Sequence, residues 1–272
     1  MIEGDAIMAG PQGAPKYAMR VDAGVNTNPG RKRTRNEDLP VSDEELGLFL
    51  VIDGMGGHAR GDVASQLIGE TVHQFIKDTA GDRDKTWPFA FDPHVSYNWN
   101  RMTTAVTMAD LQLARRISEN DQLRGMGATM TGALIEGDKA VISHVGDCRT
   151  YLIRDGQIEQ LTQDHSWVAE QVRNGSLDSL EAKRHPMRNV VTRAVAGLEE
   201  NFQLDVRELP MHAGDQLLLC SDGLHGLTTD DELLEHVRRA DTHPQEACDA
   251  LVALANERGA PDNVTVIIVR VT

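Results

Sequence analysis

Two apolar runs in the sequence each end in an aspartate followed by a glycine. Asp53 follows residues 48–52, and Asp222 follows residues 217–221. Runs of this length, rich in apolar side chains and closed by glycine, are typical of buried strands. An isolated Asp-Gly pair also favours a simple turn, but the repetition predicts that carboxylates are placed at the ends of separate strands.

Further acids stand near the rims of other predicted elements. Asp262 opens the final strand, and Glu37 and Asp38 stand together upstream. Oxygen ligands gathered from several strands are what Mg²⁺ and Mn²⁺ need, because these ions prefer octahedral oxygen coordination and keep several waters. One aspartate can bridge two ions, and the glycines after Asp53 let a free carbonyl such as that of Gly54 act as a ligand.

A basic cluster at residues 31–35 comes directly before Glu37 and Asp38. Such a cluster is also typical of a solvated loop or of a nucleic-acid patch. Because acids follow at once, one guanidinium could instead orient a phosphate beside the metal ligands. Arginine suits this task because its planar fork matches two phosphate oxygens.

Seven short stretches, taken in order, resemble the metal-dependent Ser/Thr protein phosphatases of type 2C, the PPM family, in their bacterial form. The resemblance extends from residue 20 to residue 272, and the ordered set is specific. The stretches are RTRNED at 33–38, DGMGGH at 53–58, GAT at 127–129, GDCR at 146–149, TQDH at 162–165, SDG at 221–223 and DNVT at 262–265.

The resemblance implies both a fold and an activity. The fold is α+β, an α-β-β-α sandwich of two antiparallel sheets flanked by helices, with a flap subdomain at about residues 165–200. The phosphatase domain spans residues 16–272 and follows a flexible leader at residues 1–15. The activity is hydrolysis of phosphoserine and phosphothreonine in proteins by a metal-activated water at a binuclear Mn²⁺ or Mg²⁺ centre.

The resemblance also implies which residues hold the two ions. Asp53 is the bridging ligand. Asp222 and Asp262 bind the first ion, whereas Glu37 and the Gly54 carbonyl bind the second.

Three more residues take roles from the same resemblance. Asp38 holds coordinated waters through hydrogen bonds, and Arg33 binds the substrate phosphate. Asp147 matches an aspartate that binds a third ion in bacterial members, although Gly-Asp between two strands is also a common turn.

The sequence departs from the family pattern at two places. Some members carry a histidine where this chain has Met55, and methionine cannot donate a proton to the leaving alkoxide. The proton must then come from water or from a histidine elsewhere; His58 and His185 are the candidates, although a lone surface histidine is more often inert. The flap ligand of a third ion stays unassigned, because residues 198–201 offer glutamates where an aspartate is expected.

Composition limits the class of protein and of partner. The 272 residues, 40% hydrophobic and 25% charged, fit one globular domain with a large core. A net charge of -15 argues against binding nucleic acid or an acidic membrane surface. We expect the partners to be phosphorylated proteins, the targets of a Ser/Thr kinase, and the protein to be a monomer.

Cysteine usage and hydropathy bear on the compartment. Three cysteines without close spacing indicate neither a disulfide framework nor a thiolate metal site, which fits the cytoplasm. No apolar run approaches the length of a membrane span.

Periodicity predicts the elements that position these residues. Residues 61–77 and 102–117 have helical spacing of apolar side chains, and residues 128–161 read as four strands of one antiparallel meander. An aromatic-rich insertion occupies residues 87–99, and we favour a satellite cluster packed on the domain over a protein-docking surface.

Two rival functions fit part of the pattern. A two-metal phosphodiesterase or nuclease would use the same carboxylates, but the negative charge would repel a polyanion. A catalytically inactive relative would bind phosphoproteins without hydrolysing them, which the complete set of acids disfavours.

Overall fold

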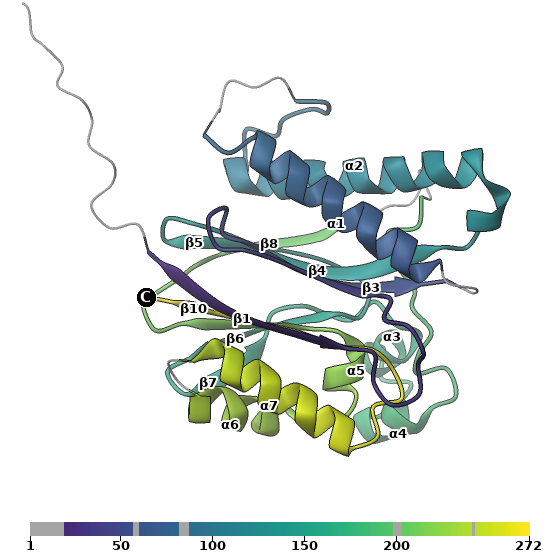
Figure 1. The fold of residues 1–272 in the computed structure, drawn as a ribbon, viewed down its shortest axis with the longest axis vertical. Coiled ribbons are helices and arrows are strands. Elements are labelled where there is room, and N and C mark those ends of the chain that lie inside the picture. Colours follow the sequence, from purple (N-terminus) through teal and green to yellow (C-terminus); the bar gives the residue numbers. More distant parts are fainter. Residues whose placement is uncertain (1–18, 57–59, 82–86, 198–202, 241–242) are drawn as a thin grey trace, which may run out of the picture.

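The computed structural model describes residues 19–272 except 57–59, 82–86, 198–202 and 241–242. Within these residues, two five-stranded antiparallel sheets pack face to face, and helices cover both outer faces (Figure 1). This architecture is the predicted α-β-β-α sandwich. The predicted leader, residues 1–15, lies outside the described residues.

One sheet has the strand order β2-β3-β4-β5-β8 and is covered by α1 and α2 (Figure 1). A 3-10 turn, Asp121–Leu123, follows α2. The elements of this half are β2 (Asp38–Asp43), β3 (Leu48–Met55), α1 (Gly61–Asp78), α2 (Tyr97–Glu119), β4 (Gly127–Glu136), β5 (Lys139–Val145) and β8 (Asp205–Pro210).

The other sheet has the strand order β1-β10-β9-β6-β7, and two short helices, α3 and α4, lie in the segment predicted as the flap. The elements of this half are β1 (Val21–Asn28), β6 (Arg149–Arg154), β7 (Gln157–Gln160), α3 (Trp167–Arg173), α4 (Ser179–Arg184), β9 (Gln216–Cys220), α5 (Asp222–His225), α6 (Asp230–Ala240), α7 (Pro244–Glu257) and β10 (Val264–Val271).

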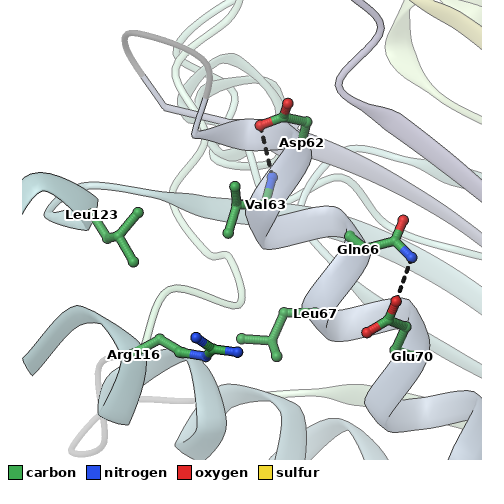
Figure 2. Close-up of a pocket in the computed structure, with 7 residues that line it drawn as sticks. All are labelled: Asp62, Val63, Gln66, Leu67, Glu70, Arg116 and Leu123. Carbon is green, nitrogen blue, oxygen red and sulfur yellow. Dashed lines mark hydrogen bonds between the residues drawn. The ribbon is translucent and has the colours of Figure 1, made fainter. Parts of the chain in front are cut away.

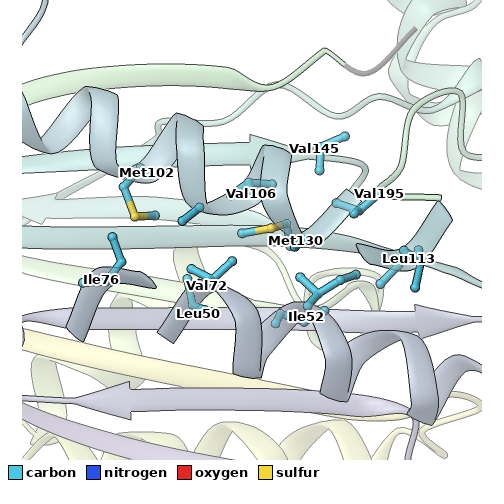
Figure 3. Packing of buried hydrophobic residues seen from close by; sticks show 14 of the residues in the cluster. Leu50, Ile52, Val72, Ile76, Met102, Val106, Leu113, Met130, Val145 and Val195 are labelled. Carbon is cyan, nitrogen blue, oxygen red and sulfur yellow. The ribbon is translucent and has the colours of Figure 1, made fainter. Parts of the chain in front are cut away.

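Strand β3 separates two of the three core layers. Leu50 and Ile52 point towards α1 and α2, and Figure 3 shows them in one apolar cluster with Val72 of α1 and Met102 of α2. Phe49 and Val51 pack instead between the two sheets. A third cluster fills the space beneath α5, α6 and α7. Side chains alternate across a strand, so one continuous apolar run can serve two layers.

The predicted meander over residues 128–161 is wrong in one respect. β4 pairs with β5, and β6 pairs with β7, but β5 and β6 belong to different sheets. The chain crosses from one sheet to the other at Gly146, Asp147 and Cys148. Turn spacing looks the same whether a connection closes a hairpin or changes sheet, so the sequence pattern could not separate the two.

Several predicted elements are confirmed. Helices α1 and α2 occupy the two segments with helical periodicity, and α2 begins earlier than predicted, at Tyr97. The aromatic insertion forms a satellite cluster, in which the ring of Trp87 lies 5.8 Å from that of Phe75, 5.3 Å from Phe91 and 5.4 Å from Tyr97. In the part of the chain that the structure describes, no helix has the length and apolar character needed to cross a bilayer.

Candidate metal centre

Asp53 faces the space between the sheets because it continues the phase of Phe49 and Val51 along β3. Both of those side chains lie in the inter-sheet core, and residues two apart on a strand share a face. Strand β3 runs on to Met55, so Asp53 lies inside the strand rather than after its end. In the register it stands between Asp38 of β2 and Thr129 of β4.

Asp38 connects the two sheets at this edge. It begins β2, and its Oδ2 accepts a hydrogen bond of 2.8 Å from the hydroxyl of Ser221, which follows β9 in the other sheet. The Ser221 hydroxyl in turn accepts the backbone N–H of Thr265 at 3.0 Å. Burial raises the pKa of Asp38 to about 6. Sequence reasoning assigned no role to Ser221, which holds Asp38 in place.

Asp222 and Asp262 come from the opposite sheet. Asp222 is the first residue of α5, separated from β9 only by Ser221, and Asp262 lies in the turn before β10. Burial raises the pKa of Asp222 to about 8, and the charges of Asp147, Asp262 and Asp38 add to the effect.

The pKa of Asp53 is raised well above its ordinary range. Burial is the largest cause, and the charges of Asp38, Asp222, Asp147 and Asp262 follow in that order. Carboxylates on both sheets therefore act on one another at a single edge of the sandwich. Clustered like charges of this kind disfavour ionisation unless a cation is present.

Glu37 and the Gly54 carbonyl meet at Gly61, the first residue of α1. A Cβ placed on Gly61 would lie 2.5 Å from the Gly54 oxygen and 2.8 Å from the carboxyl carbon of Glu37. The Gly54 N–H also donates to the Glu37 carbonyl at 3.1 Å. Two predicted ligands of the second ion are thus neighbours, and only a glycine at position 61 leaves room for them.

Arg33 lies at the rim of the carboxylate set. Its Nη2 donates to Asp262 Oδ2 at 2.8 Å, and 53% of its side chain is exposed. Asp262 raises the pKa of Arg33, with further contributions from Glu37 and Asp53. The guanidinium is therefore charged, within reach of the set and open to solvent on its other side.

Asn263 fixes the loop that carries Arg33 and Glu37. Its side-chain oxygen accepts the N–H of Glu37 at 2.9 Å, and its side-chain nitrogen donates to the carbonyls of Pro29 and Arg35 at 3.0 and 2.8 Å. Sequence reasoning noted Asn263 only as part of a motif. Its three hydrogen bonds hold the loop against the turn before β10.

Asp147 lies at the crossing between the sheets and takes part in the same electrostatic set. Burial raises its pKa to about 6, and the next cause is the charge of Asp164. Its carbonyl accepts a hydrogen bond of 2.9 Å from Nε2 of His225 on α5. The carboxylate is adjacent to the set, and its role as ligand of a third ion stays a prediction.

The residues present fit a hydrated pair of divalent cations. Asp38 Oδ1 and Asp222 Oδ1 are buried and have no hydrogen-bond partner, and buried carboxylate oxygens are seldom left without one. Across the described ranges, no three His, Cys, Asp or Glu side chains are grouped closely enough to enclose an ion by themselves. Magnesium usually takes one or two carboxylates and completes its shell with water, so the wider spacing agrees with such ions.

Of the two predicted histidine donors, the structure describes only His185. His58 lies outside the described residues. His185 lies in the flap, where its ring stacks on Trp167 with centroids 4.7 Å apart. His225, which sequence reasoning missed, has its pKa lowered to about 4 by burial, so it is a neutral hydrogen-bond donor near pH 7.

One cavity borders the candidate metal centre, and a second lies away from it. One, of about 870 Å³, opens between the predicted flap and α5–α6 and includes Asp147 and Asp222 in its wall. The other, of about 440 Å³, lies between α1 and α2 (Figure 2). Its lining carries none of the candidate site residues: it consists of Asp62, Val63, Gln66, Leu67, Glu70, Arg116 and Leu123.

Comparison with known proteins agrees with this geometry. The family model described as protein phosphatase 2C matches residues 33–257. A structure described as the catalytic domain of the serine/threonine protein phosphatase PstP in complex with two manganese ions superposes with a TM-score of 0.80 at 30% identity. The superposition covers 94% of this chain and 100% of the PstP chain.

Two curated relatives extend the comparison. The serine/threonine protein phosphatase PstP of Mycobacterium tuberculosis is 35% identical over 93% of this chain, which spans only 44% of that relative's length. The serine/threonine phosphatase stp of Listeria welshimeri is 32% identical over 91% of this chain and 94% of its own length. The chain belongs to the protein phosphatase 2C family.

Proposed function

We propose that this protein is a metal-dependent phosphatase of phosphoserine and phosphothreonine in proteins. The observation that carries the proposal is the set of carboxylates that both sheets place at one edge, with two buried oxygens lacking hydrogen-bond partners and Arg33 at the rim. The names of the relatives and the two manganese ions of the PstP catalytic domain support it.

Each side chain has a task in the proposed reaction. Asp53 would bridge two Mn²⁺ or Mg²⁺ ions, Asp222 and Asp262 would hold the first, and Glu37 with the Gly54 carbonyl would hold the second. Ions bound there lower the pKa of a shared water and neutralise the phosphoryl oxygens, so no covalent phospho-enzyme is required.

Two residues act on water and on substrate. Asp38 would orient coordinated waters through its free Oδ1, because Ser221 already occupies Oδ2. Arg33 would bind the phosphate with the part of its guanidinium fork that Asp262 leaves open. Asp147 would hold a third ion.

The partners follow from the chemistry. We expect phosphorylated proteins, the targets of a Ser/Thr kinase in a signalling pathway, to be the substrates, and a monomer to be the active form. A cytoplasmic location is supported by three free, buried cysteines.

The test is release of inorganic phosphate from a phosphothreonine peptide with Mn²⁺, with Mg²⁺ and with EDTA. We expect turnover with either ion and none with the chelator. Bis(p-nitrophenyl) phosphate serves as the phosphodiesterase probe. Faster hydrolysis of the diester than of the peptide would contradict the proposal, as would peptide turnover that persists in excess EDTA.

A further inference from the structure

The larger cavity continues from the candidate metal centre beneath the predicted flap. Asp147 and Asp222 form part of its wall, and its volume is about 870 Å³. This volume lies towards the upper end of the range of ligand pockets, about 300–1,000 Å³. A phosphorylated side chain at the metal centre would leave the neighbouring residues of its own chain beside this cavity.

The cavity has four cations in its lining, and two of them already have partners. Arg149 is bound through two hydrogen bonds of 2.9 and 2.7 Å to Asp164. Arg173 donates to the Asp164 carbonyl at 3.1 Å. Lys183 and Arg188 complete the four, and neither has an ion pair or side-chain hydrogen bond to any described residue. Both are exposed.

The opposite wall is acidic but has a structural explanation. Asp230 and Asp231 occupy the first turn of α6, where negative charge complements the helix dipole. The same turn is closed by a capping box in which Glu232 accepts the N–H of Thr229 at 2.9 Å. Helix stability therefore accounts for these acids without a ligand.

Helix stability accounts for only one of the two cations. Lys183 lies in the last turn of α4, where a cation complements the helix dipole, as does Arg184, which is absent from the cavity lining. Arg188 lies outside any helix. Residues 165–197 also carry five Lys or Arg and three Asp or Glu, in a chain whose net charge is -15. This segment is thus locally positive. The cavity lining as a whole carries five acids against four cations, so the attraction for an acidic ligand is confined to the flap side, around Lys183 and Arg188.

We propose that the cavity binds the residues flanking the phosphorylated side chain, and that Lys183 and Arg188 select substrates with acidic flanks. The inference rests on the proposed phosphatase function and specifies its substrate class. Carboxylate side chains next to the phosphoresidue would pair with the two cations and lengthen the time the peptide stays bound. Lys183 and Arg188 are then specificity-determining residues.

The test compares phosphothreonine peptides of one length that differ only in the flanks. One has neutral flanks, one has two Glu on the N-terminal side, one has two Glu on the C-terminal side, and one has two Lys on each side. The enzymes are the wild type, the double variant Lys183→Ala/Arg188→Ala and Arg184→Ala as the matched control. The readout is kcat/KM with Mn²⁺, expressed for each enzyme as a ratio to its neutral peptide.

We expect one acidic peptide to exceed the neutral one about three- to tenfold in the wild type, and the ratio to fall towards one in high salt. The double variant should lose the preference, and Arg184→Ala should keep it. A wild type without preference for either acidic peptide, a preference for the Lys peptide, or a preference that survives in the double variant would each overturn the inference. Failure of the proposed function looks different, because then even the neutral peptide would release no phosphate.

Discussion

Asp53 and Asp262 meet at one edge of the sandwich from opposite sheets, and they are held there by different means. Asp53 lies within β3, flanked in register by β2 and β4. Asp262 lies in a turn, and its surroundings are fixed by side chains, above all by Asn263 and by its ion pair with Arg33. The strand side of the site is therefore set by backbone ladders, and the turn side by polar side chains.

The two sides of the site should differ in how well they tolerate substitutions. A strand interior with close neighbours cannot move to accept an added atom. A turn held by hydrogen bonds and an exposed ion pair can adjust, because each such contact contributes only about 0.5–1.5 kcal/mol. We expect substitutions on the strand side to cost more activity than substitutions on the turn side.

The largest effect should come from Asp53→Asn, which removes the charge common to both predicted ions. We expect kcat to fall by a factor of about 10³ or more, because the nucleophilic water loses its activation. The metal-free variant should unfold at the same or a higher temperature than the metal-free wild type, since one repelling buried carboxylate is gone. Phosphate release and differential scanning calorimetry check both. Retained turnover in Asp53→Asn would show that Asp53 is not an essential metal ligand.

The same repulsion predicts a pH dependence of the metal-free protein. The pKa of Asp38 is raised to about 6 and that of Asp222 to about 8, against about 3.9 in an unfolded chain. The folded state binds these protons more tightly, so their stabilising contribution is complete below about pH 4 and is lost as the pH rises to about 8. The Tm should fall from pH 5 to pH 8, and less so in Asp222→Asn. A Tm that rises over this range in the wild type would contradict it.

Gly61→Ala tests how tightly the strand side is packed. The new Cβ would lie 2.5 Å from the Gly54 carbonyl and 2.8 Å from the Glu37 carboxyl carbon. We expect the Kd for Mn²⁺ to rise by about tenfold or more, the range seen when residues that support metal ligands are changed. Isothermal titration calorimetry measures it.

Gly69→Ala is the matched control, because it is on the same helix and its Cβ would meet the side chain of Leu39 at 2.6 Å. It should lower the Tm and leave the Kd for Mn²⁺ unchanged. Equal effects of the two variants on Mn²⁺ binding would mean that Gly61 acts only through the stability of α1.

The sequence predicted the strand side of the site better than the turn side. The strand that carries Asp53 follows from one apolar run, which needs no knowledge of partners, although Asp53 lies inside that strand and not after its end. The crossing at Asp147 depends on which sheet accepts β6, and local spacing carries no information on that. Ser221, His225 and Gly61 were missed because their contacts join segments far apart in the chain.

Arg33→Ala probes the turn side. We expect KM for a phosphothreonine peptide to rise about tenfold, because a charge-assisted phosphate contact is lost. Mn²⁺ affinity should stay the same or increase, since Asp262 is released from an ion pair of 2.8 Å. Arg35→Ala is the control: its contact with Asp62 is 3.9 Å long and exposed. Loss of Mn²⁺ binding in Arg33→Ala with KM unchanged would assign Arg33 to the metals instead.

The smallest change in overall rate should come from Met55→His, which returns to the strand side. Met55 is the last residue of β3, two positions after Asp53, so both side chains point to the same face. If protonation of the leaving alkoxide limits the rate, the wild type should lose activity steeply as the pKa of the leaving group rises. The histidine should flatten this dependence and add a pH limb near neutrality, because its pKa lies near 6.5.

The measurement is kcat for a series of aryl and alkyl phosphates in the wild type and in Met55→His. p-Nitrophenyl phosphate needs little protonation and should change by no more than a few fold, whereas alkyl phosphates should gain most. His185→Ala tests the alternative donor in the flap, where the ring of His185 stacks on Trp167. A shallow dependence in the wild type that becomes steep in His185→Ala would identify the flap histidine as the proton donor. The methionine at position 55 would then not leave the enzyme without a proton donor.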